Sequence, residues 1–165
     1  MNGAVTFSGY RPGVVAGVIG LHMAYYAPIW GFGAPFEAKL AYEMGEFLGR
    51  HDPDRDLFLA AFGDDGQLLG SITIDGVSAD GEGAHLRWFI VAPCVQGRGL
   101  GKELMRQADG FLERRDYRHA YLTTFPGLDA ARALYERYGF RLVAEEDADP
   151  WSGTVGLQRF ERRVP

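Results

Sequence analysis

Apolar side chains recur every three or four residues in four stretches of the chain, which is the spacing of one buried helix face. In the second stretch, for example, Phe36, Leu40 and Met44 follow one another at this spacing. The pattern predicts helices over residues 13–27, 35–50, 99–115 and 129–138. Residues 28–35 contain two prolines and two glycines, so an aromatic loop is expected between the first two helices.

Shorter apolar runs bounded by turn residues predict strands over residues 57–62, 67–74, 85–92, 119–125, 140–145 and 156–164. The end of the third run is apolar on both faces, as expected of a central strand. Because a helix separates the third strand from the fourth, these two strands should pair in parallel. The element order is ααβββαβαββ, and the predicted fold class is α/β (α+β) with a mixed sheet flanked by helices.

The composition excludes several classes of protein. With 165 residues, 47% hydrophobic and 24% charged, the chain is expected to form one domain over residues 1–165. A net charge of −5 disfavours a nucleic-acid partner, and no apolar run is long enough to span a membrane. The single cysteine excludes an internal disulfide, and the four histidines show no metal-ligand spacing. We therefore expect a cytoplasmic protein without a bound metal.

A glycine-rich run, Gln96–Lys102, lies between the third predicted strand and the helix that follows it. Its three glycines allow a tight bend and a close approach of the backbone to a ligand. A helix N-terminus offers unpaired N–H groups and a partial positive charge. Arg98 and Lys102 oppose that helix dipole, and their presence is explained if an anion binds there.

Three phosphate-binding patterns can be compared with this loop. A Walker A loop requires Ser or Thr after its Gly-Lys pair, where this chain has Glu103. A dinucleotide fingerprint requires another glycine spacing and an acidic residue at the end of the next strand, which here ends in Thr123-Thr124. The pattern Gln/Arg-x-x-Gly-x-Gly/Ala is met by Gln96, Gly99 and Gly101.

The third pattern resembles the acetyl-CoA loop of the GNAT N-acetyltransferases. The segment Leu134-Tyr-Glu-Arg-Tyr-Gly-Phe140 is similar to the Leu-Tyr-x-x-x-Gly-Phe segment of the same family, and the resemblance covers about residues 86–145. The N-terminal half and residues 123–131 also resemble acetyltransferase modules that are fused elsewhere to MarR-type regulators. No winged-helix segment is expected in this chain.

The resemblance implies a mixed, mostly antiparallel sheet with a central parallel pair and helices on both faces. It implies acetyl-CoA as the co-substrate and Tyr135 as the general acid. Leu128 stands where many relatives have an Asn that contacts pantetheine, so only a backbone contact is expected there. The residues implied to bind the co-substrate are Ile90, Val91, Gln96, Gly97, Arg98, Gly99, Leu100, Gly101 and Lys102.

The resulting functional hypothesis is an acetyl-CoA-dependent N-acetyltransferase that transfers the acetyl group directly to a primary amine of a small molecule or peptide. Alternatives are a non-catalytic CoA-binding module and a transferase that uses another acyl-CoA donor. His22, Tyr26 and Trp30 are candidate substrate contacts, with core packing as the alternative for each. The general base stays open between a water chain and a side chain, with the candidates Glu37, Glu43, His22 and His85. The last strand is a candidate edge for pairing in a homodimer.

Overall fold

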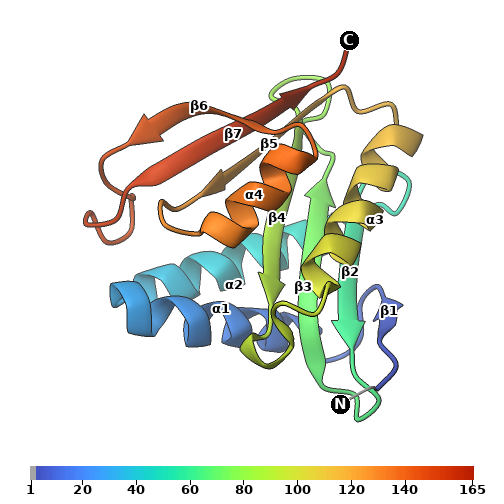
Figure 1. Cartoon of the computed structure of the whole chain (residues 1–165), viewed down its shortest axis with the longest axis vertical. Helices are drawn as coiled ribbons and strands as arrows, with labels where there is room; N and C mark the ends of the chain where they lie inside the picture. Colours follow the sequence, from blue (N-terminus) through green and yellow to red (C-terminus); the bar gives the residue numbers. More distant parts are fainter. Residues whose placement is uncertain (1–2) are drawn as a thin grey trace.

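The fold is built on a mixed sheet with the strand order β1-β2-β3-β4-β5-β7-β6, in a computed structural model that describes residues 3–165 (Figure 1). The first two residues of the predicted domain lie outside that range. The strands are β1 Thr6–Ser8, β2 Leu57–Phe62, β3 Leu68–Asp75, β4 Ala84–Val91, β5 His119–Thr124, β6 Arg141–Glu146 and β7 Leu157–Arg163. The helices are α1 Val14–Trp30, α2 Ala34–Gly49, α3 Leu100–Arg114 and α4 Asp129–Arg137, with a short 3₁₀ turn η1 at Pro93–Val95.

The predicted fold class is confirmed, because within residues 3–165 the sheet is antiparallel except where β4 pairs with β5. Sequence analysis missed β1, which is too short for a hydrophobic alternation to show. The predicted edge position of the last strand is wrong, because β7 lies between β5 and β6. In the described part of the chain, the outer strands of the sheet are therefore β1 and β6.

The loop expected over residues 28–35 is also wrong in part. Helix α1 continues through Pro28 to Trp30, and only residues 31–33 separate it from α2. Pro28 lies in the last turn of α1, where the missing N–H affects little of the helix. Gly31 ends the helix instead, because its φ of 68° is a left-handed conformation that glycine adopts readily.

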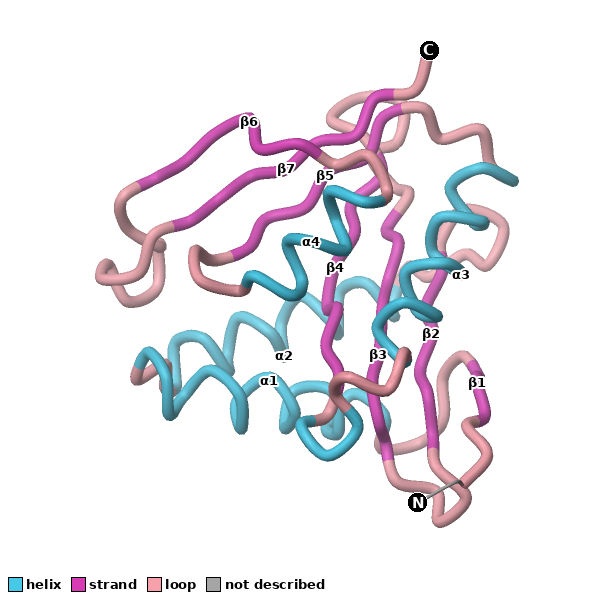
Figure 2. The backbone as a smooth tube through the Cα atoms, viewed as in Figure 1, coloured by secondary structure: helices cyan, strands magenta, loops and turns pink. Residues whose placement is uncertain are grey.

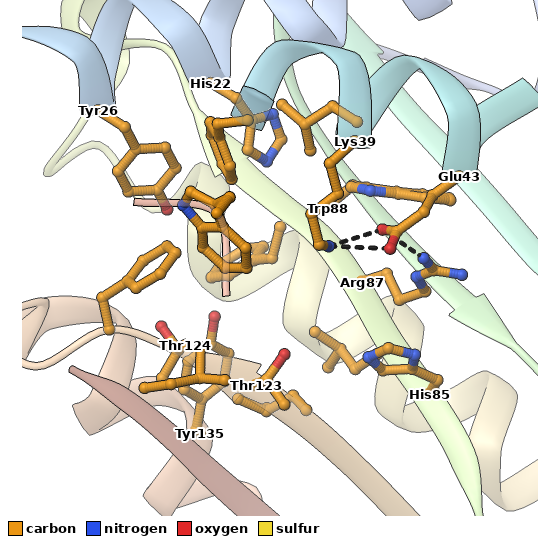
Figure 3. Close-up of a pocket in the computed structure, with 18 residues that line it drawn as sticks. His22, Tyr26, Lys39, Glu43, His85, Arg87, Trp88, Thr123, Thr124 and Tyr135 are labelled. Atoms are coloured by element: carbon orange, nitrogen blue, oxygen red, sulfur yellow. Dashed lines mark hydrogen bonds and ion pairs between the residues drawn. The ribbon is translucent and has the colours of Figure 1, made fainter. Parts of the chain in front are cut away.

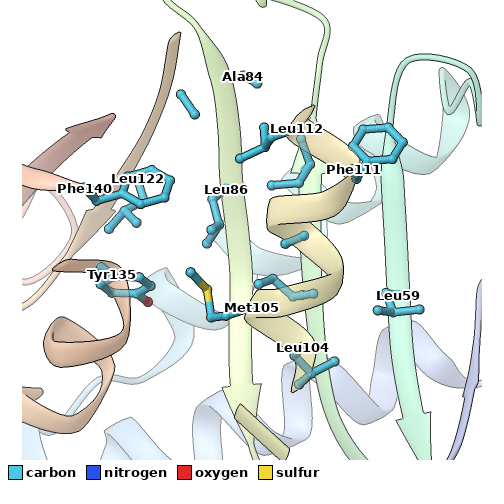
Figure 4. Close-up of a cluster of buried hydrophobic side chains, with 14 of the residues drawn as sticks. Leu59, Ala84, Leu86, Leu104, Met105, Phe111, Leu112, Leu122, Tyr135 and Phe140 are labelled. Carbon is cyan, nitrogen blue, oxygen red and sulfur yellow. The ribbon is translucent and has the colours of Figure 1, made fainter. Parts of the chain in front are cut away.

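Two hydrophobic cores lie on opposite faces of the sheet, and β2 contributes to both. Helix α3 covers one face, where Leu59, Leu86 and Leu104 belong to one buried cluster (Figure 4). Helices α1 and α2 cover the other face, where Phe58 packs with Phe47. Successive residues of a strand point to opposite faces, so a strand covered on both sides is apolar along its whole length.

The parallel pair β4–β5 determines the shape of the molecule. These strands are paired only at Ala84 with Ala120 and at His85 with Tyr121. Beyond that point β5, β6 and β7 turn away from β4, and α4 crosses in front of the widening gap (Figures 1 and 2). Residues 86–91 of β4 therefore have no strand partner on their β5 side.

A β-bulge bends β4 beside this gap. Ser71 is paired with Ile90 and Thr73 with Arg87, so the one residue between them on β3 faces two residues on β4. One of these two is Trp88, whose φ of 48° is strained for a bulky side chain. The buried Ser71 hydroxyl donates a hydrogen bond of 2.7 Å to the Trp88 carbonyl and stabilises the bend.

We expect Ser71→Ala to lower the free energy of unfolding by about 1–2 kcal/mol, because the Trp88 carbonyl loses its buried donor. Thr73→Val is the matched control: Thr73 is on the same strand, fully buried, and its hydroxyl has no hydrogen-bond partner within residues 3–165. Because an unpaired buried hydroxyl is costly, this change should leave the free energy of unfolding unchanged or raise it. Urea unfolding of both variants measures the difference, and equal losses would contradict the role given to Ser71.

Candidate active site

Two hollows meet in the gap between β4 and β5. The first, here called the channel, runs between the unpaired side of β4 and helix α4. It is lined by Tyr25, Tyr26, Phe89, Ile90, Val91, Gln96, Gly97, Gly101, Leu128, Ala130, Ala131 and Leu134. The second, here called the pocket, lies between α1, α2, β4 and β5. Tyr26 and Phe89 line both hollows, so the channel and the pocket adjoin at these two side chains.

The glycine-rich loop forms the entrance of the channel. Gly97 and Gly99 have φ values of 76° and 89°, which confirms that the bend requires glycine there. Gly99 is the N-cap of α3 and provides no side-chain cap, so the first N–H groups of the helix are free to bind an anion. The Gln96 side chain donates a hydrogen bond of 3.1 Å to the Val91 carbonyl, which fixes the loop against the end of β4.

A third glycine keeps the channel open. A Cβ atom at Gly101 would lie 3.4 Å from a methyl group of Leu134 on α4 and 3.5 Å from the Phe89 ring on β4. A larger side chain would therefore extend into the space between α3, α4 and β4. The channel is narrow and largely apolar, with backbone groups of β4 along one side, which suits an extended flexible chain.

The pocket combines polar groups from several elements around an aromatic wall (Figure 3). His22 comes from α1, Lys39 and Glu43 from α2, Arg87 from β4 and Tyr135 from α4. The wall is formed by Tyr26, Phe36, Phe125 and Trp151. These segments are far apart in the sequence, and the pocket exists only because the fold brings them together.

Ion pairs fix the charged groups of the pocket. The Lys39 ammonium lies 2.9 Å from each carboxylate oxygen of Glu43, and Arg87 donates a hydrogen bond of 2.8 Å to the same carboxylate. Arg87 also bonds the buried Asp75, which accepts two further hydrogen bonds from Arg50. Burial alone would raise the pKa of Asp75, but these hydrogen bonds hold it below the usual value. The network joins α2 to β3 and β4 and fixes the position of the Glu43 carboxylate between Lys39 and Arg87.

The two histidines of the pocket are neutral at physiological pH. Burial lowers the pKa of His22 to about 4, although its bond to the Val18 carbonyl works in the other direction. That carbonyl lies 2.8 Å from Nδ1 and can only accept, so Nδ1 carries the hydrogen and Nε2 keeps its lone pair. Burial, assisted by the charge of Arg87, lowers the pKa of His85 to about 3, and its ring stacks on Tyr121 at 4.3 Å.

Two tyrosine side chains line the pocket, and one of them, Tyr26, also lines the channel. Burial raises the pKa of Tyr135, with a smaller contribution from the neighbouring Tyr26, and burial also raises the pKa of Tyr26. Both phenols therefore stay protonated at neutral pH and can donate hydrogen bonds. Tyr135 packs against Phe89 with ring centres 5.9 Å apart, and Tyr26 stacks on Trp30 at 5.3 Å, so both rings have fixed positions.

The sequence profile of the acetyltransferase (GNAT) family matches residues 21–140. The chain belongs to this family. It is similar to the uncharacterized N-acetyltransferase YhbS of Escherichia coli K12, with 31% identity over 137 residues, which is 79% of this chain and 74% of YhbS. Both results identify an N-acetyltransferase.

Solved structures of the family have the same fold. A GNAT acetyltransferase of Staphylococcus aureus Mu50 superimposes with a TM-score of 0.76 at 16% identity, covering 98% of this chain and 100% of that chain. A GCN5-related N-acetyltransferase of Kribbella flavida gives 0.74 at 20% identity, covering 98% of each chain. The PaiA N-acetyltransferase of Thermoplasma acidophilum in complex with coenzyme A gives 0.65 at 18% identity, covering 98% of this chain and 99% of that chain. No helix within residues 3–165 of this acetyltransferase is long and apolar enough to cross a membrane.

The structure separates the nine predicted co-substrate residues into three groups. Ile90, Val91, Gln96, Gly97 and Gly101 line the channel. Arg98, Gly99 and Leu100 line a neighbouring hollow on the other side of the α3 N-terminus, and Lys102 is exposed outside both. The Leu100 side chain is buried in the core, so in the acetyltransferase only its backbone can reach a ligand.

Only some of the predicted substrate contacts and candidate bases line the pocket. His22 and Tyr26 line the pocket of the acetyltransferase, whereas Trp30 stacks behind Tyr26 and does not line it. Among the candidate bases, Glu43 and the two histidines line the pocket. Glu37 is exposed on α2 and does not line the pocket.

Sequence reasoning missed Lys39 and Arg87 as pocket residues. Lys39 precedes Glu43 by one helical turn, and that spacing is the only local signal of an ion pair. Trp151 reaches the pocket from the connection between β6 and β7, where the buried Asp149 carboxylate accepts hydrogen bonds from the backbone of Trp151 and Val155 at 3.0 Å. These bonds, with two more from Ser152, hold the pKa of Asp149 well below its usual range although burial opposes them.

We expect the buried histidines to make folding of the acetyltransferase pH-dependent. The unfolded chain takes up protons on His22 and His85 below their ordinary pKa of 6.5, whereas the native state does not until about pH 4 and about pH 3. Their contribution to stability is complete above that ordinary value and is lost as the pH falls. Each should cost about 1 kcal/mol between about pH 7 and about pH 5.5.

Urea unfolding of the wild type, His22→Gln and His85→Gln at these two pH values measures the effect. In each variant, the decrease in the free energy of unfolding between these two pH values should be about 1 kcal/mol smaller than in the wild type. This holds even if the substitution changes the stability at pH 7. The same pH-dependent loss in all three proteins would show that these histidines do not stay neutral in the native state.

Proposed function

We propose that the enzyme transfers the acetyl group of acetyl-CoA directly to the primary amine of a small molecule or peptide. The observation that carries this proposal is the junction of the channel and the pocket at Tyr26 and Phe89. A thioester that enters along the channel would present its acetyl group there, within reach of an amine in the pocket. The prediction of a cytoplasmic location rests on the single cysteine and stays a prediction.

Successive parts of the channel would bind successive parts of CoA, from the pyrophosphate at the glycine-rich loop to the pantetheine arm along β4. The free N–H groups at the start of α3 would bind the pyrophosphate, and the unpaired side of β4 at Val91 would bond an amide group of pantetheine. Ile90, whose backbone is directed toward Ser71 on β3, would contact pantetheine through its side chain. Leu128 lines the channel where the family often has an Asn, so it offers the pantetheine arm an apolar surface rather than a side-chain hydrogen bond.

The reaction requires three events at the junction. The amine nitrogen forms a bond to the carbonyl carbon, and the carbon–sulfur bond breaks. The amine also loses a proton, which either protonates the departing thiolate, so that CoA leaves as the thiol, or passes to solvent. Tyr135 would donate a hydrogen bond to the departing sulfur. His22 would accept a hydrogen bond from the neutral amine at Nε2, because Nδ1 is occupied by the Val18 carbonyl.

We expect calorimetric titration with acetyl-CoA or CoA to show micromolar affinity and Gly99→Glu to weaken it at least about tenfold, because a carboxylate at the α3 N-cap repels the pyrophosphate. Gly13→Glu is the matched control, since Gly13 has the same φ of 89°, caps α1 and also has open space around it. This control should bind like the wild type. Equal CoA affinity in both variants would show that the glycine-rich loop is not part of the CoA site.

We expect Tyr135→Phe to lower the rate of thiol release at least about tenfold while CoA affinity stays the same, because the ring keeps its packing and only the hydroxyl is lost. Tyr138→Phe is the control from the end of the same helix, since Tyr138 lines neither the channel nor the pocket. An unchanged rate of thiol release in Tyr135→Phe would show that Tyr135 has only a packing role. Tight CoA binding with no transfer to any amine would identify a binding module instead.

A further inference from the structure

The pocket does not share the acidic excess of the whole chain, which carries a net charge of −5. The charged side chains that line the pocket are the cations Lys39 and Arg87 and the anion Glu43, and the lining histidines are neutral. Both oxygens of Glu43 already bond these cations. Arg87 also bonds Asp75, so a second ammonium group on a polyamine would find no free carboxylate on this wall.

Two N–H donors on residues that line the pocket have hydrogens without an acceptor in the described part of the chain. The Lys39 ammonium has three hydrogens and bonds only Glu43 within residues 3–165, and it lies 5.2 Å from the centre of the Trp151 ring. The Trp151 Nε1 atom is buried and has no hydrogen-bond partner in the described part of the chain. A buried donor without an acceptor is costly. The two donors match the two oxygens of a carboxylate.

The rest of the pocket wall is aromatic. The Tyr26 ring meets Phe36 edge-on at 5.7 Å and Phe125 at 5.5 Å, and the Phe36 and Trp151 rings are 5.4 Å apart. Such a wall binds an apolar or aromatic body through contact area rather than hydrogen bonds. Tyr26 belongs both to this wall and to the junction, and Trp151 belongs both to this wall and to the two donors.

We propose that the acceptor is a primary amine that carries a carboxylate beside an apolar body, as an α-amino acid with a hydrophobic side chain does. This inference rests on the proposed acetylation of amines. Lys39 and Trp151 bind the carboxylate, Phe36 and Phe125 contact the apolar body, and the amine faces the junction at Tyr26. The nitrogen gains the acetyl group, the carbon–sulfur bond breaks, and CoA leaves as the thiol.

A matched pair of acceptors tests the carboxylate. Phenylalanine and phenethylamine differ by that group alone, and the ratio of their kcat/KM values with acetyl-CoA should be at least about tenfold in favour of phenylalanine. Lys39→Gln and Trp151→Phe should each reduce this ratio at least about fivefold, whereas Lys39→Arg should preserve it. The change in the ratio between enzymes is decisive, because the ionisation of the two amines is the same in each assay.

Arg118→Gln is the charge control, since the Arg118 side chain is 65% exposed, bonds Asp116 and does not line the pocket. It should leave the ratio unchanged. A ratio that Lys39→Gln does not alter, or spermidine acetylated as well as phenylalanine, would overturn the proposal. Thermal unfolding of each variant confirms that it is folded, and Trp151→Phe keeps an aromatic ring in the wall.

A binding experiment separates this inference from the proposed function. Phenylalanine and phenethylamine are titrated into the enzyme with CoA present, so that binding is measured without transfer. Tighter binding of phenylalanine that Lys39→Gln abolishes would support the carboxylate site even if no amine were acetylated, and only the proposed function would then fail. Equal binding of the two amines would overturn the carboxylate site even if both were acetylated.

Discussion

The short pairing of β4 with β5 is the constraint on which the rest of the structure depends. Two residues of each strand are paired, and the strands then separate. A continuous sheet would bury the side of β4 that carries Ile90 and Val91 in a β-ladder and would leave no space for the channel. Because the strands separate, α4 can lie over the gap, the glycine-rich loop can open into it, and backbone groups of β4 stay available for a ligand. The bulge at Trp88 adds a bend at the same place.

The pocket shows why net charge says little about a binding site. The chain has 22 acidic and 17 basic residues, yet the carboxylate that lines the pocket is held between two cations. Burial keeps His22 and His85 neutral, so the pocket contains no histidine that gains charge near physiological pH. Its polarity is therefore fixed by paired side chains on α2 and β4, which also join these two elements.

Local signals in the sequence were sufficient for the fold class and the bend of the glycine-rich loop, because helical periodicity, turn residues and loop spacing involve neighbours along the chain. The role of Tyr135 comes from the family resemblance and stays a prediction. The predicted end of α1 was placed before Pro28, but the helix continues to Trp30 because Gly31 ends it. Strand β7 pairs with β5 on one side and with β6 on the other. Nothing within residues 156–164 indicates that the strand has two partners. Lys39 and Arg87 could not be assigned to the pocket because their roles depend on contacts between elements that are distant in the sequence.

The two halves of the site differ in how they relate to the family. The channel is lined by residues from Tyr25 to Leu134, all within the segment that matches the family profile, residues 21–140. Trp151 lies beyond that segment, on a connection that the Asp149 carboxylate holds in place. The part that would bind the shared donor is thus the part the family has in common, whereas one wall of the pocket comes from outside it. Substitutions in the β6–β7 connection would therefore alter one wall of the pocket without altering the lining of the channel.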